Sequence, residues 1–290
     1  MSPRAYLFVP GNAPAKMEKA AAGPADAVIL DLEDSVAPEA KDAALDATCA
    51  FLHAAGEGAR GRYWVRVNAT EPARALREVA RLPLEALAGL MIPKLSALER
   101  LLPVAHALDA LEARDGLEAG AVGLIGIVTE TAAALLAGAD LGRGHPRLKG
   151  YCWGVEDLSA DIGRPQWPEA PEAAARLARC AQDFCLLAAT AAGIDAIDCV
   201  DTDIHNAAAL AAQTRLAAQL GFRGKLAIHP AQVDPIQKAF LPDPESLTWA
   251  RQVVELAEAG GGRSAFQLNG RMIDRPHIAA ARRLLGRNGD

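Results

Sequence analysis

The sequence predicts a (β/α)₈ barrel with a C-terminal helical extension. The first observation is a set of short apolar runs that are mostly continuous rather than alternating, as expected for strands buried on both faces. There are eight of these runs: Tyr6–Val9, Ala27–Leu32, Tyr63–Val67, Gly89–Ile92, Gly123–Val128, Gly150–Trp153, Ala196–Val200 and Lys225–Ile228. The second observation is that stretches with helical spacing separate the runs, and this alternation indicates a parallel sheet. Eight such units are typical of a closed barrel of about 250 residues.

The helical stretches are rich in alanine and leucine, and the clearest are Ala40–His53, Ala97–Ala113 and Pro171–Ala192. An open, doubly wound sheet is the alternative arrangement for the same alternation. Such sheets often carry a Gly-x-Gly-x-x-Gly turn between a strand and the next helix that binds dinucleotides, and none of the eight strand-like runs is followed by such a turn. The number of strand-like runs therefore favours the barrel.

The composition restricts the class of protein. Apolar residues make up 51% of the 290 residues, enough for a large core, and the formal net charge of −6 gives no reason to expect nucleic acid as a partner. The five cysteines are irregularly spaced without a Cys-x-x-Cys pair, which indicates reduced thiols. No apolar run reaches the roughly 20 residues of a membrane-spanning helix, and the first residues do not resemble a secretion signal. We therefore expect a cytoplasmic protein without a membrane partner.

The chain divides near residue 240 into a catalytic barrel, residues 1–240, and an extension, residues 241–290. Leu241-Pro242-Asp243-Pro244 is a turn-rich break, and Thr248–Ala259 has helical spacing. Gly260-Gly261-Gly262 is predicted to be a hinge, and Phe266–Leu285 to hold a short extended piece and a basic helix. A segment after a glycine hinge is either a lid over a site or a tail that packs against the barrel.

Two acidic residues follow the fifth and sixth strands, Glu130 and Asp157. Because the carboxyl ends of barrel strands meet at one face, both side chains are expected at the same mouth. Mg²⁺ prefers oxygen ligands and is commonly held by one or two carboxylates plus substrate and water. The alternative is that each acid only complements the dipole of the helix that follows it.

Arg66 lies at the end of the third strand, within an apolar run. An unpaired buried charge is unfavourable, so the guanidinium needs a partner. The acids Asp31, Glu33 and Asp34 end the second strand and can supply it, although Asp34 could instead cap a helix. Arg66 then either forms a structural ion pair or grips a carboxylate or oxyanion of a substrate.

Three further strand ends carry chemically useful groups. Lys94 follows the fourth strand and could be a Schiff-base lysine, but a lysine that organises the neighbouring acids is the favoured interpretation. Lys16 and Lys19 belong to a helix that opens after the first strand, where a phosphate could bind. His229 precedes a proline at the last strand and is either a base or a structural histidine.

Taken together, these segments resemble the citrate lyase beta-subunit-like family, which is grouped with the malyl-CoA and citramalyl-CoA lyases among the barrel aldolases. The matching segments cover almost the whole chain, in order: Leu7–Asn12, Leu30–Val36, Val65–Asn68, Pro93-Lys94, Glu130–Ala132, Gly154–Leu158, Ala196–Asp198 and Ile228–Pro230. Asn269–Pro276 resembles the lid segment of the CoA-lyase branch.

The resemblance implies roles for individual residues. Glu130 and Asp157 match the Mg²⁺ ligands, and Arg66 matches the arginine that contacts the thioester and the small acid. Asp274 matches the lid aspartate that serves as acid and base and reaches into a neighbouring subunit. The residues that match coenzyme A contacts are Phe8, Lys19, Ile228 and His229, while Asp31, Glu33, Asp34 and Lys94 are expected to support the ligands from behind.

The implied activity is a lyase that uses Mg²⁺, or Mn²⁺, to cleave a 3-hydroxy-3-carboxy acyl-CoA into acetyl-CoA and a 2-oxo acid, or to run the reverse condensation. The resemblance also implies a homo-oligomer, a trimer or a hexamer. Two alternatives remain: a metal aldolase for free hydroxy-oxo acids, and a citrate lyase subunit that works on an acyl carrier protein. Ala13 and Asn206 depart from the family pattern, at positions for the coenzyme A phosphates and for the acid.

Overall fold

The computed structural model describes residues 2–56, 61–164, 171–259 and 265–286. It divides into two compact units, Pro3–Phe240 and a smaller one made chiefly of Leu241–Asp290. The predicted hinge Gly260-Gly261-Gly262 lies outside the described residues.

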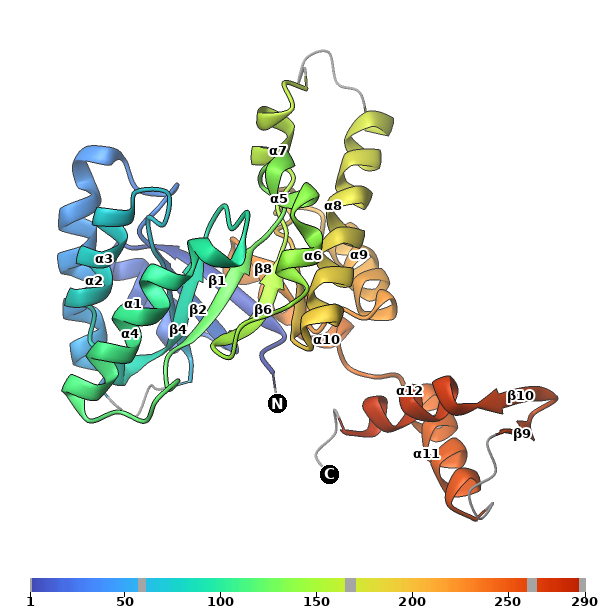
Figure 1. Cartoon of the computed structure of the whole chain (residues 1–290). Coiled ribbons are helices and arrows are strands. Elements are labelled where there is room, and N and C mark those ends of the chain that lie inside the picture. The colour runs from blue at the N-terminus through green and yellow to red at the C-terminus, as the bar shows by residue number, and fades with distance from the viewer. Residues whose placement is uncertain (1, 57–60, 165–170, 260–264, 287–290) are drawn as a thin grey trace. The chain divides into compact units, whose positions relative to one another are not determined.

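The larger unit is a closed parallel barrel, which confirms the predicted fold class. Its strands are β1 (Ala5–Pro10), β2 (Ala27–Asp31), β3 (Tyr63–Arg66), β4 (Leu87–Ile92), β5 (Gly123–Ile127), β6 (Leu148–Cys152), β7 (Asp195–Asp198) and β8 (Gly224–Ala227). Each strand pairs with the next in sequence, and β8 pairs with β1. This last pairing excludes the open sheet. Figure 1 shows the strands surrounded by the helices that connect them.

The connecting helices are α1 (Pro14–Ala22), α2 (Lys41–Ala55), α3 (Pro72–Arg81), α4 (Leu102–Asp115), α5 (Ala132–Leu136), α6 (Gly138–Leu141), α7 (Glu156–Asp161), α8 (Pro171–Ala192), α9 (Ala207–Leu220) and α10 (Val233–Ala239). The predicted range of α8 is correct. The predicted helix Ala97–Ala113 instead contains a 3₁₀ turn, η4 (Leu98–Arg100), followed by α4. Pro103 causes the break, because proline has no N–H to donate and is accommodated in the first turn of a helix.

The barrel has two apolar layers. The strand side chains that fill the interior of the barrel form one cluster, which includes Ile29, Met91, Ile125 and Leu226. The outward side chains pack against the helices in a larger cluster. Both layers are expected for strands buried on two faces, and they hold the strand ends at fixed positions around the mouth.

The smaller unit holds α11 (Pro244–Ala259), β9 (Ala265–Leu268), β10 (Arg271–Asp274) and α12 (Arg275–Gly286). The predicted extended piece is an antiparallel hairpin, whose turn residues Asn269 and Gly270 have φ values of 50° and 75°. Positive φ at both central positions is the geometry that Asn-Gly favours in two-residue hairpins. The unit has its own small apolar core of Ala250, Val253, Ile273 and Ala281.

Besides η4, the described part of the barrel contains the short helical turns η1 (Pro38–Ala40), η3 (Leu84–Ala86) and η5 (Pro230–Gln232). In the part of the chain that the structure describes, no helix is both long enough and apolar enough to span a membrane.

Candidate active site

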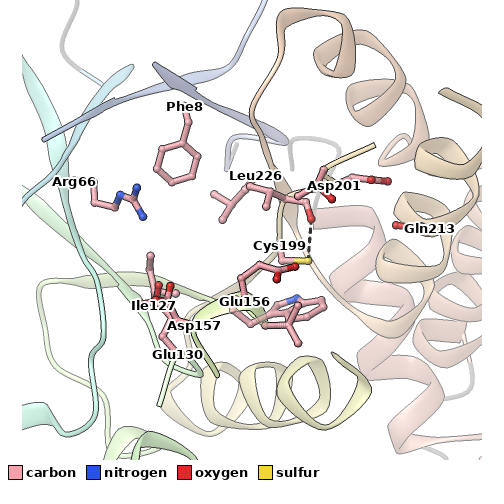
Figure 2. Close-up of a pocket in the computed structure, with 15 residues that line it drawn as sticks. Phe8, Arg66, Ile127, Glu130, Glu156, Asp157, Cys199, Asp201, Gln213 and Leu226 are labelled. Carbon is pink, nitrogen blue, oxygen red and sulfur yellow. Dashed lines mark hydrogen bonds between the residues drawn. The ribbon is translucent and has the colours of Figure 1, made fainter. Parts of the chain in front are cut away.

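A cavity of about 290 Å³ opens at the carboxyl ends of the strands. It brings together Arg66, Glu130 and Asp157, which come from three different strand ends (Figure 2). The other lining residues are Phe8, Ile127, Trp153, Gly154, Val155, Glu156, Cys199, Val200, Asp201, Thr202, Gln213 and Leu226. The sequence therefore predicted the charged centre of the cavity, whereas Glu156, Asp201 and Gln213 were missed.

Glu130 is a buried acid at this centre. Its side chain follows β5 and is 4% exposed. Burial raises the pKa of Glu130 to about 8, and the nearby carboxylates of Glu33 and Asp157 add to the effect, although Lys94 opposes it. The helix that follows is capped by the hydroxyl of Thr131, so Glu130 is not needed as a cap. A carboxylate held in this environment favours a bound proton or a cation.

Lys94 connects the acids through both its backbone and its side chain. Its N–H donates to Oε2 of Glu130 at 2.6 Å, and Nζ lies 3.1 Å from Oε1 of Glu33 and 3.5 Å from Oδ1 of Asp157. The residue adopts a φ of 50°, a left-handed conformation that is uncommon for a side chain of this kind. Burial lowers the pKa of Lys94, but the neighbouring acids outweigh it and hold the pKa above its usual value. A Schiff-base role needs a neutral amine, so the structure favours the organising role.

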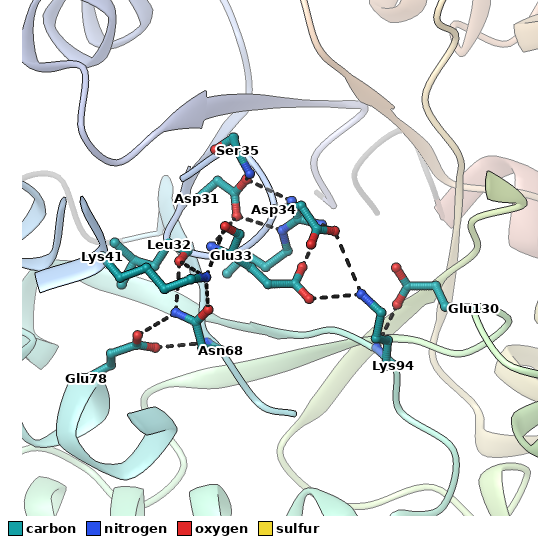
Figure 3. Close-up of polar contacts among 11 residues, drawn as sticks. Asp31, Leu32, Glu33, Asp34, Ser35, Lys41, Asn68, Glu78, Lys94 and Glu130 are labelled. Atoms are coloured by element: carbon teal, nitrogen blue, oxygen red, sulfur yellow. Dashed lines mark hydrogen bonds and ion pairs between the residues drawn. The ribbon is translucent and has the colours of Figure 1, made fainter. Parts of the chain in front are cut away.

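Arg66 is held by the acids that end β2, Asp31, Glu33 and Asp34, which are labelled in Figure 3. Its Nε and Nη2 donate to the two carboxylate oxygens of Asp31, each at 2.7 Å, and Nη1 lies 3.1 Å from Glu33. The guanidinium also stacks on Phe8, at 4.9 Å from the ring centroid. Arginine has five N–H donors, and the bonds to Asp31 use two of them. The ion pair and a substrate contact are therefore compatible.

Asp34 has no capping role, because α2 begins only at Lys41 and its N-terminal residues make no side-chain cap. The carboxylate of Asp34 is instead half-exposed and lies 3.7 Å from Nη1 of Arg66 and 3.8 Å from Nζ of Lys94. It completes a group of acids around these two cations.

A hydrogen-bond network behind the acids Asp31, Glu33 and Asp34 was not predicted (Figure 3). Nζ of Lys41 donates to the carbonyl oxygens of Leu32 and Glu33, each at 3.2 Å, and to Oδ1 of Asn68. The Nδ2 and backbone N–H groups of Asn68 both donate to the carboxylate of Glu78, which is 1% exposed. Burial raises the pKa of Glu78. The network fixes the backbone from which Asp31 and Glu33 reach Arg66.

Apolar side chains, Trp153 among them, form another part of the cavity lining, and a hydrogen bond behind the cavity holds Trp153 in place. The indole Nε1 of Trp153 donates to Oδ1 of Asp198 at 2.8 Å. Asp198 also accepts from Nζ of Lys225 at 2.6 Å, and both members of this pair are buried. The thiol of Cys199 lines the same cavity, and burial raises its pKa, so the group is neutral.

A second cavity of about 390 Å³ is also lined by Arg66. It shares Phe8, Arg66 and Val200 with the first cavity, and Ile228 is among its other lining residues. Phe8 and Ile228 thus lie where the extended part of a ligand that reaches Arg66 could bind. His229 is exposed and caps η5, where its Nδ1 accepts from the N–H of Ala231.

Lys19 is exposed in the last turn of α1 and lines neither cavity. Asp274 ends β10 in the smaller unit, where its Oδ1 lies 2.5 Å from Nδ1 of His277. The hydrogen bond from His277 lowers the pKa of Asp274. The contact with His277 was not predicted. It is a short-range contact across the start of α12, and the i, i+3 spacing of an acid and a histidine could have indicated it.

Among the described residues, no cluster of three His, Cys, Asp or Glu side chains is arranged to hold a metal ion. Mg²⁺ does not require such a cluster, since one or two carboxylates with substrate and water complete its octahedron. Glu130 and Asp157 supply two carboxylates at one cavity, and burial leaves the carboxylate of Glu130 poorly solvated, which raises its pKa. The donor set therefore fits a hard divalent cation.

Comparison with known proteins gives concordant matches. A model of the HpcH/HpaI aldolase/citrate lyase family matches residues 4–230. A citrate lyase subunit beta-like protein of Mycobacterium tuberculosis (strain CDC 1551 / Oshkosh) is 35% identical over 285 residues, covering 98% of this chain and 95% of the relative. A (3S)-malyl-CoA thioesterase of Cereibacter sphaeroides (strain KD131) is 32% identical over 292 residues, covering 98% and 94%. The crystal structure of protein CitE from Mycobacterium tuberculosis with magnesium, acetoacetate and coenzyme A superposes with a TM-score of 0.72 at 32% identity, covering 99% of this chain and 98% of that one.

Proposed function

Because the chain belongs to the HpcH/HpaI aldolase/citrate lyase family, a family of lyases, we propose that it is a Mg²⁺-dependent carbon–carbon lyase acting on acyl-CoA thioesters. The proposed substrate is a 3-hydroxy-3-carboxy acyl-CoA of the malyl-CoA or citramalyl-CoA kind. The products are acetyl-CoA and a 2-oxo acid, and the reverse reaction is a Claisen-type condensation.

The observation that carries this proposal is the single cavity that holds Glu130, Asp157 and Arg66. Two carboxylates and a guanidinium provide complementary sites for a cation and for an oxygen that gains negative charge. The similar CitE structure was solved with magnesium, acetoacetate and coenzyme A, which are a metal, a small oxo acid and the acyl carrier of the kinds proposed for this chain.

Glu130 and Asp157 would hold the metal ion. When bound there, Mg²⁺, or Mn²⁺ in its place, supplies Lewis-acid polarisation of the oxygens of the small acid. Lys94 lies behind the two ligands, with Nζ 3.5 Å from Oδ1 of Asp157 and 3.1 Å from Oε1 of Glu33, and its positive charge partly balances these acids. Glu130 must lose its proton before it can serve as a ligand, because its pKa is about 8 in the free site.

In the cleavage direction, a base removes the proton of the substrate hydroxyl, the bond between the hydroxyl carbon and the thioester α-carbon breaks, and its electron pair forms the thioester enolate. Arg66 would donate to the enolate oxygen from the N–H groups that Asp31 does not use. Asp274 is the proposed base, and it can return the same proton to the enolate carbon, which gives acetyl-CoA. The atoms therefore balance without a further reactant.

The second cavity supports a coenzyme A thioester over a free hydroxy-oxo acid. It adjoins Arg66 and has an apolar edge formed by Phe8, Val9 and Ile228. A pantetheine arm laid in this cavity would bring its thioester to Arg66, whereas a free acid would have no use for the space. His229 adjoins Ile228 and would lie near the entrance, whereas the position of Lys19 gives it no direct part in either cavity.

The test is an acyl-CoA panel assayed with and without Mg²⁺, in which acetyl-CoA, 2-oxo acid and free thiol are measured separately. The proposal predicts equal amounts of acetyl-CoA and oxo acid, with no product in EDTA. Free thiol without oxo acid would show thioester hydrolysis instead, the activity for which one relative is named. Turnover only with an acyl carrier protein thioester would support the lyase-complex alternative, and turnover of free acids would support the aldolase.

A further inference from the structure

The hydroxyl of Thr129 joins the chain after β5 to the chain after β6. The last residues of the two strands in register are Ile127 and Cys152. Two residues beyond each of them, Oγ1 of Thr129 donates to the carbonyl oxygen of Gly154 at 2.9 Å and accepts from the N–H of Gly154 at 3.0 Å. A hydroxyl can donate and accept at once, so this fully buried side chain takes the place of a backbone partner.

This contact bears on both carboxylates of the cavity. Glu130 follows Thr129 directly in the chain. Gly154 also lies beside Glu130 in space, since a Cβ added to Gly154 would be 3.6 Å from Cγ and 4.0 Å from Oε1 of Glu130. Asp157 follows Gly154 by three residues, in the first turn of α7. A movement of Gly154 relative to Thr129 would therefore change the separation of the two carboxylates.

Asp161 makes a second contact between the same two segments. Its Oδ2 accepts from the N–H of Ala132, the first residue of α5, at 2.7 Å. The helix α7 needs such support, because its six residues are too few for a helix that is stable by itself, and Val155 at its N-cap makes no side-chain cap. The contacts of Thr129 and Asp161 thus lie on either side of Glu130 in one segment and of Asp157 in the other.

From these contacts we infer that Thr129 and Asp161 are positioning residues, which hold the carboxylates of Glu130 and Asp157 at the separation that one divalent cation requires. Neither is among the described residues that line the cavity, so each acts through the backbone that it fixes. Mg²⁺ demands nearly ideal octahedral geometry, which makes its affinity sensitive to small displacements of a ligand. The inference rests on the proposed function in that it takes Glu130 and Asp157 as the ligands.

Binding of Mn²⁺ to the full chain without substrate tests the role of Thr129. Titrations followed by the electron paramagnetic resonance signal of the free ion give the affinity directly. Thr129→Val keeps the shape of the side chain but removes the hydroxyl, and it should weaken Mn²⁺ binding about tenfold or more, as expected when support behind a metal ligand is lost. Thr129→Ser keeps the hydroxyl and should bind Mn²⁺ about as tightly as the unmodified protein.

The matched control for Thr129 is Thr214→Val. Thr214 is equally buried, and its Oγ1 donates to the carbonyl oxygen of Leu210 at 2.7 Å within α9. This variant should leave the Mn²⁺ affinity unchanged. An equal affinity of the unmodified protein and folded Thr129→Val would overturn the role of Thr129. Equal weakening in Thr129→Val and Thr214→Val would do so too, because it would show a general effect on the barrel.

A pair of variants tests Asp161 and also decides the inference if Thr129→Val does not fold. Asp161 is exposed, so its replacement should leave the barrel folded. Asp161→Asn loses the charge but keeps an oxygen that can accept from Ala132, whereas Asp161→Ala loses both. Asp161→Ala should therefore bind Mn²⁺ several-fold more weakly than Asp161→Asn, and equal affinities would overturn the role of Asp161. If the unmodified protein binds no Mn²⁺, the metal site of the proposed function fails, whereas unchanged binding in the variants removes the positioning role alone.

Discussion

Asp31 and Arg66 face each other in register on the neighbouring strands β2 and β3, and two hydrogen bonds of 2.7 Å join them. The pair fixes the plane of the guanidinium at the junction of the two cavities. Burial raises the pKa of Asp31, but the hydrogen bonds from Arg66 outweigh this and lower it overall, so the acid stays ionised. The fixed plane leads to the first prediction.

Arg66→Lys should reduce turnover by roughly two to three orders of magnitude, the range for loss of one oxyanion donor. Lysine keeps the charge but not the planar fork that holds both Asp31 and a substrate oxygen. Steady-state kinetics on the best acyl-CoA of the panel measures the effect. The matched control is Arg62→Lys. Arg62 donates to the carbonyl oxygens of Ala21 and Gly23 near the end of α1, so its replacement should lower the melting temperature and leave turnover of the folded enzyme unchanged. Full turnover of the Arg66→Lys enzyme would restrict Arg66 to a structural role.

The pKa of Glu130 leads to a prediction about metal binding. Since this pKa is about 8, Mg²⁺ must displace a proton at neutral pH. The affinity for Mg²⁺ should rise about tenfold per pH unit up to about pH 8 and then level off. Calorimetry in buffers of different ionisation enthalpy should show close to one proton released per metal ion bound at pH 7. An affinity that does not change between pH 6 and 8 would contradict the assignment of Glu130.

Glu130→Gln tests the same residue through stability. An acid whose folded pKa lies above its unfolded value favours folding only at low pH, and its contribution is lost as pH rises from about 4.5 toward 8. At high pH the ionised, buried Glu130 destabilises the folded protein, and glutamine, which cannot ionise, removes this destabilisation. In EDTA at pH 8 the variant should therefore melt higher than the unmodified protein, by roughly 2–8 °C, and the difference should shrink at pH 5. Glu130→Gln and Asp157→Asn should both lose activity. The control Asp234→Asn removes an exposed acid of α10 and should alter neither property.

The network of Lys41, Asn68 and Glu78 predicts an effect at a distance from the substrate. Lys41→Met should lower turnover about tenfold or more with little change in the affinity for the thioester, because the carbonyl oxygens of Leu32 and Glu33 lose their anchor. The free energy of unfolding should also fall by about 1–3 kcal/mol, as expected when buried polar groups lose a partner. Lys238→Met removes an exposed lysine paired with Asp234 and serves as the control. Unchanged turnover in Lys41→Met would limit the network to stability.

Asp274 is expected to act in the active site of a neighbouring subunit of a homo-oligomer, a trimer or a hexamer. Asp274→Asn and Glu130→Ala should each be inactive, yet mixed and re-assembled subunits should recover part of the activity. Recovery occurs because some sites then combine Glu130 from one chain with Asp274 from another. The control mixes Glu130→Ala with Asp157→Ala. Both of these changes lie in one cavity of the same barrel, so no exchange can restore a site. No recovery with Asp274→Asn, despite demonstrated subunit exchange, would place Asp274 in its own subunit or outside the mechanism.

The sequence predicted the barrel and the charged centre of its mouth because both depend on local patterns. A strand buried on two faces leaves a continuous apolar run, and charged residues at the end of the run or just past it mark the strand end, as at Arg66 and Glu130. The braces behind the site depend instead on register. Asp198 and Lys225 lie opposite each other on β7 and β8, and nothing in either segment alone indicates the pairing. The hairpin differs from these braces, because Asn269-Gly270 is a local signal for a two-residue turn within the segment predicted only as a short extended piece.

The smaller unit closes around an apolar core of its own, and the junction with the barrel falls between Phe240 and Leu241. Phe240 belongs to the barrel core, whereas Leu241 is exposed. A genetic crossover at this junction would separate no strand from its sheet and divide neither core. Related genes could therefore exchange their 3′ ends while each product keeps a foldable barrel. Chimaeras joined at this position would show which unit determines the choice of acid and which determines the fate of the enolate.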